Sequence, residues 1–584
     1  MHRTHHCNEL RAAHIGQAVT LEGWVNRRRD LGSLIFIDVR DREGMTQIII
    51  DPAASPEAHK AGGDVRPEWV LRVRGTVRSR GQQVNTHMAT GEIEVLAAHV
   101  EVLSTCPTPP FPLDGDEESD DLRLQYRYLD LRRPRLREAM RARHLITQAV
   151  RTYLTAQGFW EIETPILTKS TPEGARDYLV PSRVHPGHFY ALPQSPQLLK
   201  QLCMVSGLER YFQVCRCFRD EDLRADRQPE FTQIDIEMSF ASQDDVFAVT
   251  EGVITAAFAA WGREAGAPFA RLSYQAAMET YGTDKPDLRY ELPQVDVTDA
   301  VRGCAFQAFK TVCEEGGRVK AMRVPGGATL SRREVDELGK AAAALGAKGV
   351  LAAKFLPTGE KQSPLAKSLT DAEWQAITAA TGAEAGDCVL FVADKAPLVH
   401  QALGAVRTSV AERLGLAKPG TYAFAWITDF PLFSFDKEEN RWVSEHHPFT
   451  APHEEDLAFL ESDPGRVRSS SYDLVVNGIE LASGSVRIHR RDVQERVFKI
   501  LRLTPEETQE RFGFFLDALQ YGAPPHAGIA PGLDRLVMLI LGRSSLRDVI
   551  AFPKTQKAAD LLSGAPSPVR AAQLDELHIS ITKE

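Results

Sequence analysis

The chain has 584 residues, enough for about four domains of ordinary size. Hydrophobic residues make up 43% and charged residues 25% of it, which excludes a disordered chain, a collagen and a disulfide-stapled miniprotein. The formal net charge is −10, so any contact with nucleic acid must be made by a local surface and not by the charge of the whole chain.

Cysteine usage and the N-terminus indicate a reducing compartment. The eight cysteines form no C-x-x-C motif, and only Cys215 and Cys217 lie close together, which argues against a zinc site and a disulfide framework. The N-terminal residues are polar and lack the apolar core of a signal peptide. Because no run of about 18 apolar residues occurs, we expect a cytoplasmic protein with no membrane contact.

Residues 1–104 are predicted to form a small β-barrel. Five short segments alternate apolar and polar residues or are rich in β-branched residues, and turn residues separate them. The predicted strands are 19–26, 34–39, 45–50, 70–78 and 92–103, with a polar loop at 27–33. Five strands in about 100 residues favour a closed barrel, of which the OB-fold is one type.

The remainder of the chain mixes helices and strands. Four prolines and an acidic run at 114–121 predict a linker. Apolar residues at helical spacing predict a long helix over 136–153 that stops at Gly158. Further strands are predicted at 211–218, 232–240, 422–428, 471–476 and 484–488, and a helix at 243–261. Residues 290–420 are interpreted as an independent α/β insertion.

Two segments carry an arginine in a place suited to a nucleotide. Arg219 follows a predicted strand in a loop of alternating charges, where a guanidinium can bind a phosphate oxygen. Arg535 lies in the first turn of a predicted helix after 528–532, whose glycines allow close approach of a backbone to a nucleotide. Taken singly, the first segment is equally typical of a surface hairpin, and the second of simple helix packing.

Other motifs carry less information. Residues 185–188 match the short H-x-G-H signature of class I aminoacyl-tRNA synthetases, but they lie in a proline-flanked loop and no K-M-S-K-S follows. No P-loop motif occurs. The adjacent His446 and His447 lack further ligands at matching spacing, so we do not expect them to bind a metal.

In chain order, the segments 158–165, 219–221 and 532–535 resemble motifs 1, 2 and 3 of class II aminoacyl-tRNA synthetases. A closer resemblance is to the bacterial aspartyl-tRNA synthetase family. It is carried by S-T-P-E-G-A-R-D-Y at 170–178, Q-S-P-Q-L-L-K at 194–200, H-H-P-F at 446–449 and G-S-V-R-I-H at 484–489. The resemblance covers nearly the whole chain and is least close at 114–121 and in the C-terminal tail.

The resemblance implies a multidomain α+β fold with an N-terminal OB-fold β-barrel, a class II catalytic domain built on an antiparallel sheet, and an α/β insertion domain. It also implies a homodimer with motif 1, including Pro165, at the interface. The expected parts are 1–104 (anticodon-binding OB-fold), 105–133 (hinge), 134–289 and 421–560 (catalytic domain), 290–420 (insertion domain) and 561–584 (C-terminal extension).

The implied reaction joins aspartate to tRNA in two steps. The carboxylate of L-aspartate attacks the α-phosphate of ATP, which gives aspartyl-adenylate and pyrophosphate, and the 3′ end of tRNA-Asp then accepts the aspartyl group. No enzyme nucleophile is needed, so the protein must position the reactants and neutralise phosphate charge. The alternative is a non-discriminating enzyme that also charges tRNA-Asn with aspartate; Leu31 resembles the discriminating form.

By position in the motifs, Arg219 and Arg535 are the expected catalytic residues, as ligands of the α- and γ-phosphates. Mg²⁺ is the expected cofactor, held with substrate ATP by Asp473 and Glu480. The expected ATP-binding residues are Arg219, Asp220, Glu221, Gln228, Phe231, Glu480, Gly532, Leu533, Asp534 and Arg535, and Phe231 resembles the ring that stacks on adenine. The expected aspartate-binding residues are Glu173, Ser195, Gln197, Lys200, Arg219, Asp235, His446 and Arg487.

The aspartate side chain brings a second negative charge, so its pocket must be cationic. Lys200 and Arg487 fit this requirement, and a protonated His446 would add to it. Lys200 would repel a lysine substrate, and a neutral asparagine amide would leave a buried cation uncompensated, which argues against lysyl and asparaginyl enzymes. Glu173, Gln197 and Asp235 resemble the acceptors of the α-ammonium group. Residues 170–178 are expected to close over aspartate as a mobile loop.

Four barrel residues resemble anticodon contacts: Arg29, Phe36, Gln47 and Glu94. Phe36 would stack on a base, although a lone phenylalanine in a strand is more typical of a core. Residues 1–104 contain 13 Lys+Arg and 13 Asp+Glu, so charge gives little support for RNA binding. A catalytically inactive tRNA-binding paralogue is the other alternative; it would be expected to have lost Arg219, Arg535 or Glu480.

Overall fold

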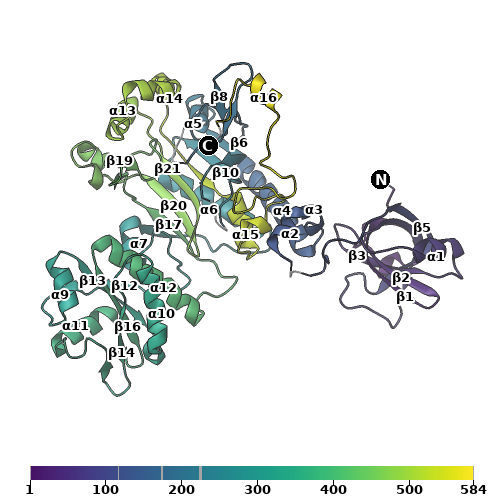
Figure 1. Cartoon of the computed structure of the whole chain (residues 1–584), viewed down its shortest axis with the longest axis horizontal. Coiled ribbons are helices and arrows are strands. Elements are labelled where there is room, and N and C mark those ends of the chain that lie inside the picture. The colour runs from purple at the N-terminus through teal and green to yellow at the C-terminus, as the bar shows by residue number, and fades with distance from the viewer. Residues whose placement is uncertain (1, 116–117, 172–174, 223–225, 583–584) are drawn as a thin grey trace. The chain divides into compact units, whose positions relative to one another are not determined.

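The computed structural model describes residues 2–115, 118–171, 175–222 and 226–582. The chain divides into two compact units, Met1–Glu138 and Ala139–Glu584 (Figure 1). Among the described residues, each helix is too short or too polar to span a membrane.

The first unit contains a closed five-stranded barrel with the strand order β1-β2-β3-β5-β4 (Figure 1). Its elements are β1 (Ala18–Leu31), β2 (Leu34–Arg40), β3 (Met45–Ile50), α1 (Pro56–Gly63), β4 (Val70–Ser79) and β5 (Ile93–Ser104). Alternate side chains such as Leu21, Ile35 and Ile37 fill the barrel core. The barrel predicted from the alternation is therefore confirmed.

The loop predicted at 27–33 is wrong. β1 continues to Leu31 and pairs with β2 as far as Leu31 opposite Leu34, which leaves Gly32 and Ser33 as the turn. A β-bulge between Val25 and Arg27 shifts the register. The arginines beyond the bulge lie at the end of the strand, where little apolar surface covers either face, so the strand shows no alternation.

The segment predicted as a linker contains two short helices, α2 (Asp120–Gln125) and α3 (Arg127–Asp130). Ser119 caps α2 by accepting a hydrogen bond from the backbone N–H of Leu122. Arg127 and Asp130 are buried and form an ion pair with a length of 2.8 Å. Acidic residues at the start of α2 suit a helix N-terminus, so the acidic run is only partly a linker.

The second unit is built on an eight-stranded sheet with the order β11-β17-β20-β21-β22-β10-β9-β6. The strands from β17 to β9 are antiparallel, and the outer pairs β11–β17 and β6–β9 are parallel. The strand bounds are β6 (Trp160–Glu161), β9 (Arg210–Phe218), β10 (Glu230–Ser239), β11 (Ala270–Ser273), β17 (Phe424–Thr428), β20 (Ser471–Val476), β21 (Ile479–Val486) and β22 (His526–Pro531). The antiparallel catalytic sheet expected from the sequence is confirmed.

The two faces of this sheet differ in chemistry, as β10 illustrates. Ile234, Ile236 and Met238 belong to the largest hydrophobic core, together with residues of α4 (Pro134–Ala156), α6 (Gln243–Ala259) and α15 (Leu533–Ile540). Asp235 and Glu237 alternate with them and are completely buried on the opposite face. One face of the sheet therefore carries helices, and the other carries buried charge.

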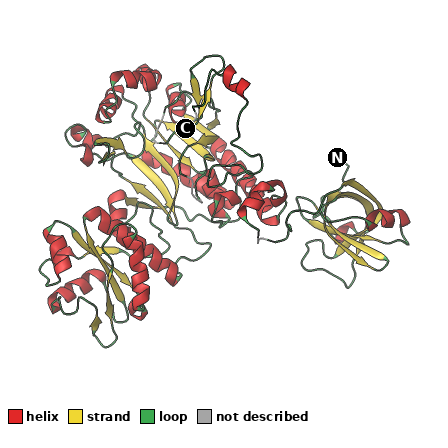
Figure 2. Ribbon diagram, viewed as in Figure 1, coloured by secondary structure: helices red, strands yellow, loops and turns green. Residues whose placement is uncertain are grey.

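A second sheet in this unit has the order β12-β13-β16-β14-β15 and lies between helices (Figure 2). The helices α10 and α12 share one core with it, and α8, α9 and α11 share another. This α/β arrangement agrees with the one expected for the insertion. The bounds are β12 (Gln294–Asp296), α8 (Thr298–Val301), α9 (Gln307–Glu314), β13 (Arg318–Val324), α10 (Arg332–Ala343), β14 (Leu351–Phe355), β15 (Lys361–Gln362), α11 (Asp371–Thr381), β16 (Cys388–Asp394) and α12 (Ala396–Leu414).

The remaining elements are small, and residues 185–188 form the turn between β7 and β8. That position confirms an ordinary loop there and not a nucleotide-binding helix start. The bounds are β7 (Leu179–Pro181), β8 (Phe189–Ala191), α5 (Gln197–Val205), α7 (Tyr274–Tyr281), β18 (Phe433–Asp436), β19 (Arg441–Ser444), α13 (Arg491–Ile500), α14 (Pro505–Ala518) and α16 (Ala571–Glu576).

Candidate active site

A cavity of about 930 Å³ lies on the charged face of the eight-stranded sheet. Lys200 of α5, Arg219 after β9, Arg487 after β21 and Arg535 of α15 all line it. The sequence predicted that these four cations meet in one site, and the structure places all four around one cavity. The other predicted site residues that line the cavity are Ser195, Gln197, Glu221, Gln228, Phe231, Asp235, His446, Asp473, Glu480, Gly532 and Asp534.

Three residues predicted to belong to the site are not among those that line the cavity. The side chain of Leu533 is buried in the hydrophobic core beneath the sheet, because α15 turns its apolar face that way. Asp220 does not line the cavity; its carboxylate lies 3.7 Å from the guanidinium of Arg176. Glu173 lies outside the described residues.

Four buried charges form one network in the cavity wall. Lys200 pairs with Asp235, and its Nζ lies 3.2 Å from Oε2 of Glu237. Arg487 donates from Nε and Nη2 to the two carboxylate oxygens of Glu237, at 2.9 and 3.1 Å. The pocket was expected to be cationic, but its charges cancel: the carboxylates of Asp235 and Glu237 balance the positive charges of Lys200 and Arg487. Buried charges require such partners because desolvation of an unpaired ion is costly.

The network also shifts the pKa values of its two acids, Glu237 and Asp235, in opposite directions. Burial alone would raise the pKa of Glu237, but Arg487 and Lys200 lower it to about 2. Burial raises the pKa of Asp235 despite the neighbouring Lys200. The Oδ2 atom of Asp235 is buried and has no hydrogen-bond partner among the described residues. This oxygen is an unused acceptor at the cavity wall, as a bound ammonium group would need.

The adjacent histidines have opposite electrostatic character. Burial opposes the charged form of His446, but its hydrogen bond to Asp473, with 3.3 Å between Nε2 and Oδ1, raises its pKa. Burial and the cation of Arg487 lower the pKa of His447 far below its usual value. Neutral His447 can then accept a hydrogen bond of 2.8 Å from Arg487 Nη1. Over the residues that the structure describes, no group of three or more His, Cys, Asp or Glu could hold a metal ion.

The arginines predicted to bind phosphate, Arg219 and Arg535, line the same cavity. The guanidinium of Arg219 lies over the ring of Phe231, 5.1 Å from its centroid. Arg535 donates from Nη1 to the backbone oxygen of Glu480 at 2.8 Å, and Nη2 lies 3.4 Å from Asp226. These contacts fix each guanidinium while leaving part of it accessible to a ligand.

Gln228 and Asp534, which were predicted to contact ATP, use their side chains in hydrogen bonds and an ion pair within the protein. The amide of Gln228 donates to the backbone oxygen of Lys554 and accepts from its N–H, at 3.1 and 2.8 Å. The carboxylate of Asp534 accepts from the backbone N–H of Thr232 at 2.8 Å and pairs with Arg143. Both residues therefore shape the wall of the cavity, whatever they contact in a ligand.

The predicted magnesium ligands lie on neighbouring strands. Asp473 of β20 faces His446, and Glu480 of β21 faces Lys285, with 2.8 Å between Lys285 Nζ and Glu480 Oε2. Two carboxylates are a donor set with which proteins commonly hold Mg²⁺ together with phosphate oxygens of a substrate. The residues present therefore fit this ion.

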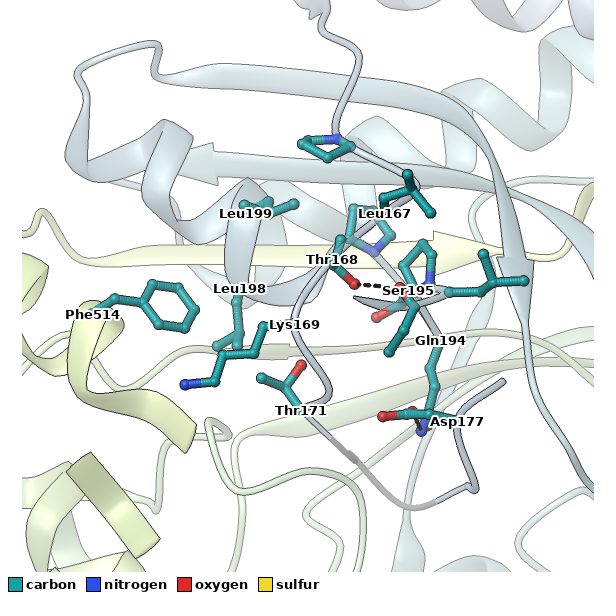
Figure 3. Close-up of a pocket in the computed structure, with 15 residues that line it drawn as sticks. Leu167, Thr168, Lys169, Thr171, Asp177, Gln194, Ser195, Leu198, Leu199 and Phe514 are labelled. Atoms are coloured by element: carbon teal, nitrogen blue, oxygen red, sulfur yellow. Dashed lines mark hydrogen bonds between the residues drawn. The ribbon is translucent and has the colours of Figure 1, made fainter. Parts of the chain in front are cut away.

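A smaller cavity of about 180 Å³ adjoins the loop predicted to cover aspartate (Figure 3). Leu167, Leu198 and Phe514 form its apolar wall, and it shares Gln194 and Ser195 with the large cavity. Asp177 holds this loop by accepting hydrogen bonds from Gln194 and Ser170. The described ends of the loop are thus tied to the wall of the large cavity.

In the first unit, the four predicted anticodon residues form one cluster outside the hydrophobic core of the barrel, in which Gln47 and Glu94 are buried. Phe36 is half-buried outside the core, which corrects the expectation from the isolated residue. Arg29 lies 5.9 Å from the Phe36 ring centroid and donates to Gln47 at 2.9 Å. Gln47 donates in turn to Glu94 at 2.7 Å. Leu31 is exposed at the end of β1.

The sequence analysis missed His447, Asp284 and Lys285, which line the large cavity. It also missed Glu237 and Ser485, which accept hydrogen bonds from Arg487 in the cavity wall. Glu237 carried a usable signal, because two acids in alternate positions of an otherwise apolar strand imply a charged face. His447 and Ser485 lie in the motifs at 446–449 and 484–489, which did not by themselves assign them a role. Asp284 and Lys285 lie outside these motifs and gave no signal.

Comparison with known protein families settles the class of the chain. The family described as "tRNA synthetases class II (D, K and N)" matches residues 119–556. The chain belongs to this family of class II tRNA synthetases. The family described as "OB-fold nucleic acid binding domain" matches residues 19–103, which are the barrel of this synthetase.

Relatives of this class II synthetase extend over its full length. An "Aspartate--tRNA(Asp/Asn) ligase" of Anoxybacillus flavithermus is 54% identical, over 99% of this chain and 98% of the relative. An "Aspartate--tRNA ligase" of Geobacillus kaustophilus is 53% identical, over 100% and 99%. The solved asparaginyl-tRNA synthetase of Pyrococcus horikoshii, complexed with asparaginyl-adenylate, has a TM-score of 0.60 at 18% identity, over 95% of this chain and 99% of that one. At 18% identity, the similarity to this solved structure shows a shared fold and nothing about the substrate.

Proposed function

We propose that this class II synthetase is an aspartate–tRNA ligase. It activates L-aspartate with ATP and transfers the aspartyl group to the 3′ end of tRNA-Asp. The observation that carries the proposal is the buried network of Lys200, Asp235, Glu237 and Arg487, which opens on the same cavity as Arg219 and Arg535. Full-length relatives that are 53–54% identical and named for this activity support it.

The substrate aspartate matches the network group by group. Its ammonium binds the unused oxygen of Asp235, and its side-chain carboxylate accepts hydrogen bonds from Lys200 and Arg487. Glu237 holds Arg487 in place so that its guanidinium keeps one orientation. Asparagine has no charge to offer these donors and is bound weakly.

In the activation step, an oxygen of the aspartate α-carboxylate attacks the α-phosphorus of ATP. The bond from this phosphorus to the oxygen that bridges to the β-phosphate breaks, and pyrophosphate leaves with the electron pair. Arg219 neutralises the α-phosphate, Arg535 binds the γ-phosphate, and Phe231 stacks on adenine. Asp473 and Glu480 would hold Mg²⁺, which would supply further charge neutralisation on the phosphates.

In the transfer step, a hydroxyl of the terminal adenosine of tRNA attacks the carbonyl carbon of the adenylate, and AMP leaves. The barrel binds the anticodon, with Phe36 stacked on a base and Arg29, Gln47 and Glu94 at base edges or backbone. We propose that this reaction takes place in the cytoplasm.

We also propose a homodimer in which motif 1 lies at the interface. Trp160, Ile166 and Leu167, which flank or follow Pro165, are 64%, 41% and 51% exposed in the single chain. Apolar side chains so exposed are typical of a surface covered by a partner. Light scattering coupled to gel filtration is expected to give twice the chain mass of 64.7 kDa.

The test of the activity is ATP–pyrophosphate exchange with aspartate, asparagine or lysine as the only amino acid. Exchange with aspartate alone is expected. Exchange with one of the other two, or with none, overturns the proposal. Charging of purified tRNA-Asp and tRNA-Asn side by side then decides between the discriminating enzyme and the non-discriminating alternative.

A further inference from the structure

Lys285 lies in the active cavity, and the proposed reaction assigns it no role. It follows α7 in the segment 282–291, and its Nζ is 2.8 Å from Oε2 of Glu480. The backbone oxygen of Glu480 accepts a hydrogen bond of 2.8 Å from Arg535. Lys285 and Arg535 therefore contact the same residue, one at its carboxylate and the other at its backbone.

The segment that carries Lys285 is fixed by Arg407 of α12. Arg407 is 1% exposed and donates to the backbone oxygens of Asp287, Tyr290 and Glu291 at 2.9, 2.7 and 2.8 Å. Its guanidinium also lies 4.3 Å from the ring centroid of Tyr290. A buried guanidinium with three carbonyl acceptors allows this segment little freedom.

Backbone contacts add to this restraint. Gly282 has φ +73°, and a Cβ atom there would lie 2.0 Å from the backbone oxygen of His400 on α12. A Cβ atom on Gly404 of the same helix would lie 2.8 Å from the oxygen of Gly282. Two glycines are therefore required for α12 to approach the base of the segment, and this approach places Lys285 beside Glu480.

A lysine and a divalent cation compete for one carboxylate. Glu480 is the predicted ligand of Mg²⁺, and Lys285 pairs with its carboxylate at 2.8 Å. A lysine has a flexible stem and a compact charge, so it can leave one anion for another nearby. The triphosphate of ATP would be that second anion, in the same cavity.

We propose that Lys285 is a further ATP-binding residue of this enzyme: it pairs with Glu480 when the site holds no nucleotide and moves to the β- and γ-phosphates when ATP binds with its metal. Arg407 is the positioning residue that holds its segment. This inference rests on the proposed function, since it assumes that the cavity binds ATP. It also assigns a role to the domain that contains the second sheet, because α12 of that domain carries Arg407, which restrains the segment of Lys285.

The kinetic test compares Lys285→Met and Lys285→Arg in ATP–pyrophosphate exchange at saturating Mg²⁺. We expect Lys285→Met to raise the KM for ATP roughly 10-fold, as for loss of one charge-assisted hydrogen bond, and to leave the KM for aspartate unchanged. Lys285→Arg should recover most of the loss. Lys418→Met is the matched control, because Lys418 is exposed and does not line the cavity.

A binding test that is independent of activity uses Mn²⁺ and electron paramagnetic resonance on nucleotide-free enzyme. Loss of the competing ammonium should let Lys285→Met bind Mn²⁺ roughly 10-fold more tightly than the wild type. Unchanged Mn²⁺ affinity, or an unchanged KM for ATP, overturns the inference. Wild-type enzyme with no aspartate-dependent exchange overturns the proposed function instead, while the Mn²⁺ result still reports on the pairing.

The role of Arg407 is tested by non-additivity. Arg407→Lys should raise the KM for ATP in the wild-type background and should add nothing in the Lys285→Met background, because both changes remove the same contact. Equal increases in both backgrounds would mean a general structural role and would refute the positioning role.

Discussion

Among single residues, Glu237 is the acid on which both buried cations of the site depend. It accepts two hydrogen bonds from Arg487 and lies 3.2 Å from Lys200. A pocket for a dicarboxylic amino acid needs cations, but buried cations without partners would destabilise the empty enzyme. Glu237 meets both requirements, because it stabilises both cations and orients the guanidinium that we propose contacts the substrate.

We predict that Glu237→Gln lowers the free energy of unfolding at pH 7 by about 3 kcal/mol, because it leaves a buried charge unpaired. The folded pKa of about 2 lies below the ordinary value of 4.5. Ionised Glu237 therefore stabilises the fold above pH 4.5, and this contribution is lost as the pH falls from 4.5 toward 2. Urea unfolding of both proteins at several pH values checks this. A difference that stays constant through that window would contradict it.

A second prediction concerns Arg487 itself. Arg487→Leu removes the guanidinium donors and should raise the KM for aspartate about 100-fold, which is about 2.7 kcal/mol. The KM for ATP should change little, because the phosphate-binding arginines lie elsewhere in the cavity. Arg487→Lys keeps the charge of the pair with Glu237 and serves as the control for folding. An unchanged KM for aspartate in Arg487→Leu would remove Arg487 from the substrate pocket.

Among the elements, the contact of β10 with β22 requires a glycine. A Cβ atom on Gly528 would lie 1.9 Å from Oε2 of Glu237 and 2.3 Å from the backbone oxygen of Ile236. Neither atom can move away, because the oxygen of Ile236 belongs to the backbone of β10 and the carboxylate of Glu237 is held by Arg487 and Lys200. Gly528 therefore lets the charge network lie directly against the sheet.

We predict that Gly528→Ala destabilises the fold by at least about 2 kcal/mol, through overpacking of the core. The matched control is Gly339→Ala in α10, where the nearest atom to an added Cβ is 4.0 Å away. That change should instead stabilise the protein by about 0.5–1 kcal/mol, because alanine favours helix. Thermal unfolding of the two variants should move in opposite directions. Equal destabilisation by both would contradict the steric explanation.

The elements also show what the sequence could and could not predict. Strands such as β3 and β20 are short runs that end in consecutive β-branched residues, and they were predicted to the residue. The end of β1 was missed because both of its faces near the turn are polar. Lys285 was missed for a different reason. Its partner Glu480 is 195 residues away, and only tertiary packing through α12 brings them together.

In the whole molecule, the barrel proposed to bind the anticodon and the cavity proposed for catalysis belong to separate compact units. The barrel has its own hydrophobic core, and the activation site lies entirely within the residues of the second unit. Damage confined to the barrel exterior should therefore leave aspartate activation intact. Phe36 is suited to test this, because it is half-buried outside the barrel core.

We predict that Phe36→Ala raises the KM for tRNA in aspartylation by roughly 10-fold, within the ~1–3 kcal/mol of one lost stacking contact. Aspartate-dependent ATP–pyrophosphate exchange should stay at the wild-type rate. Phe36→Tyr keeps an aromatic face beside Arg29 and should restore tRNA binding. Loss of both activities in Phe36→Ala would show that Phe36 supports folding. Loss of charging alone would mean that the second unit does its chemistry without the barrel and depends on it only to select the RNA.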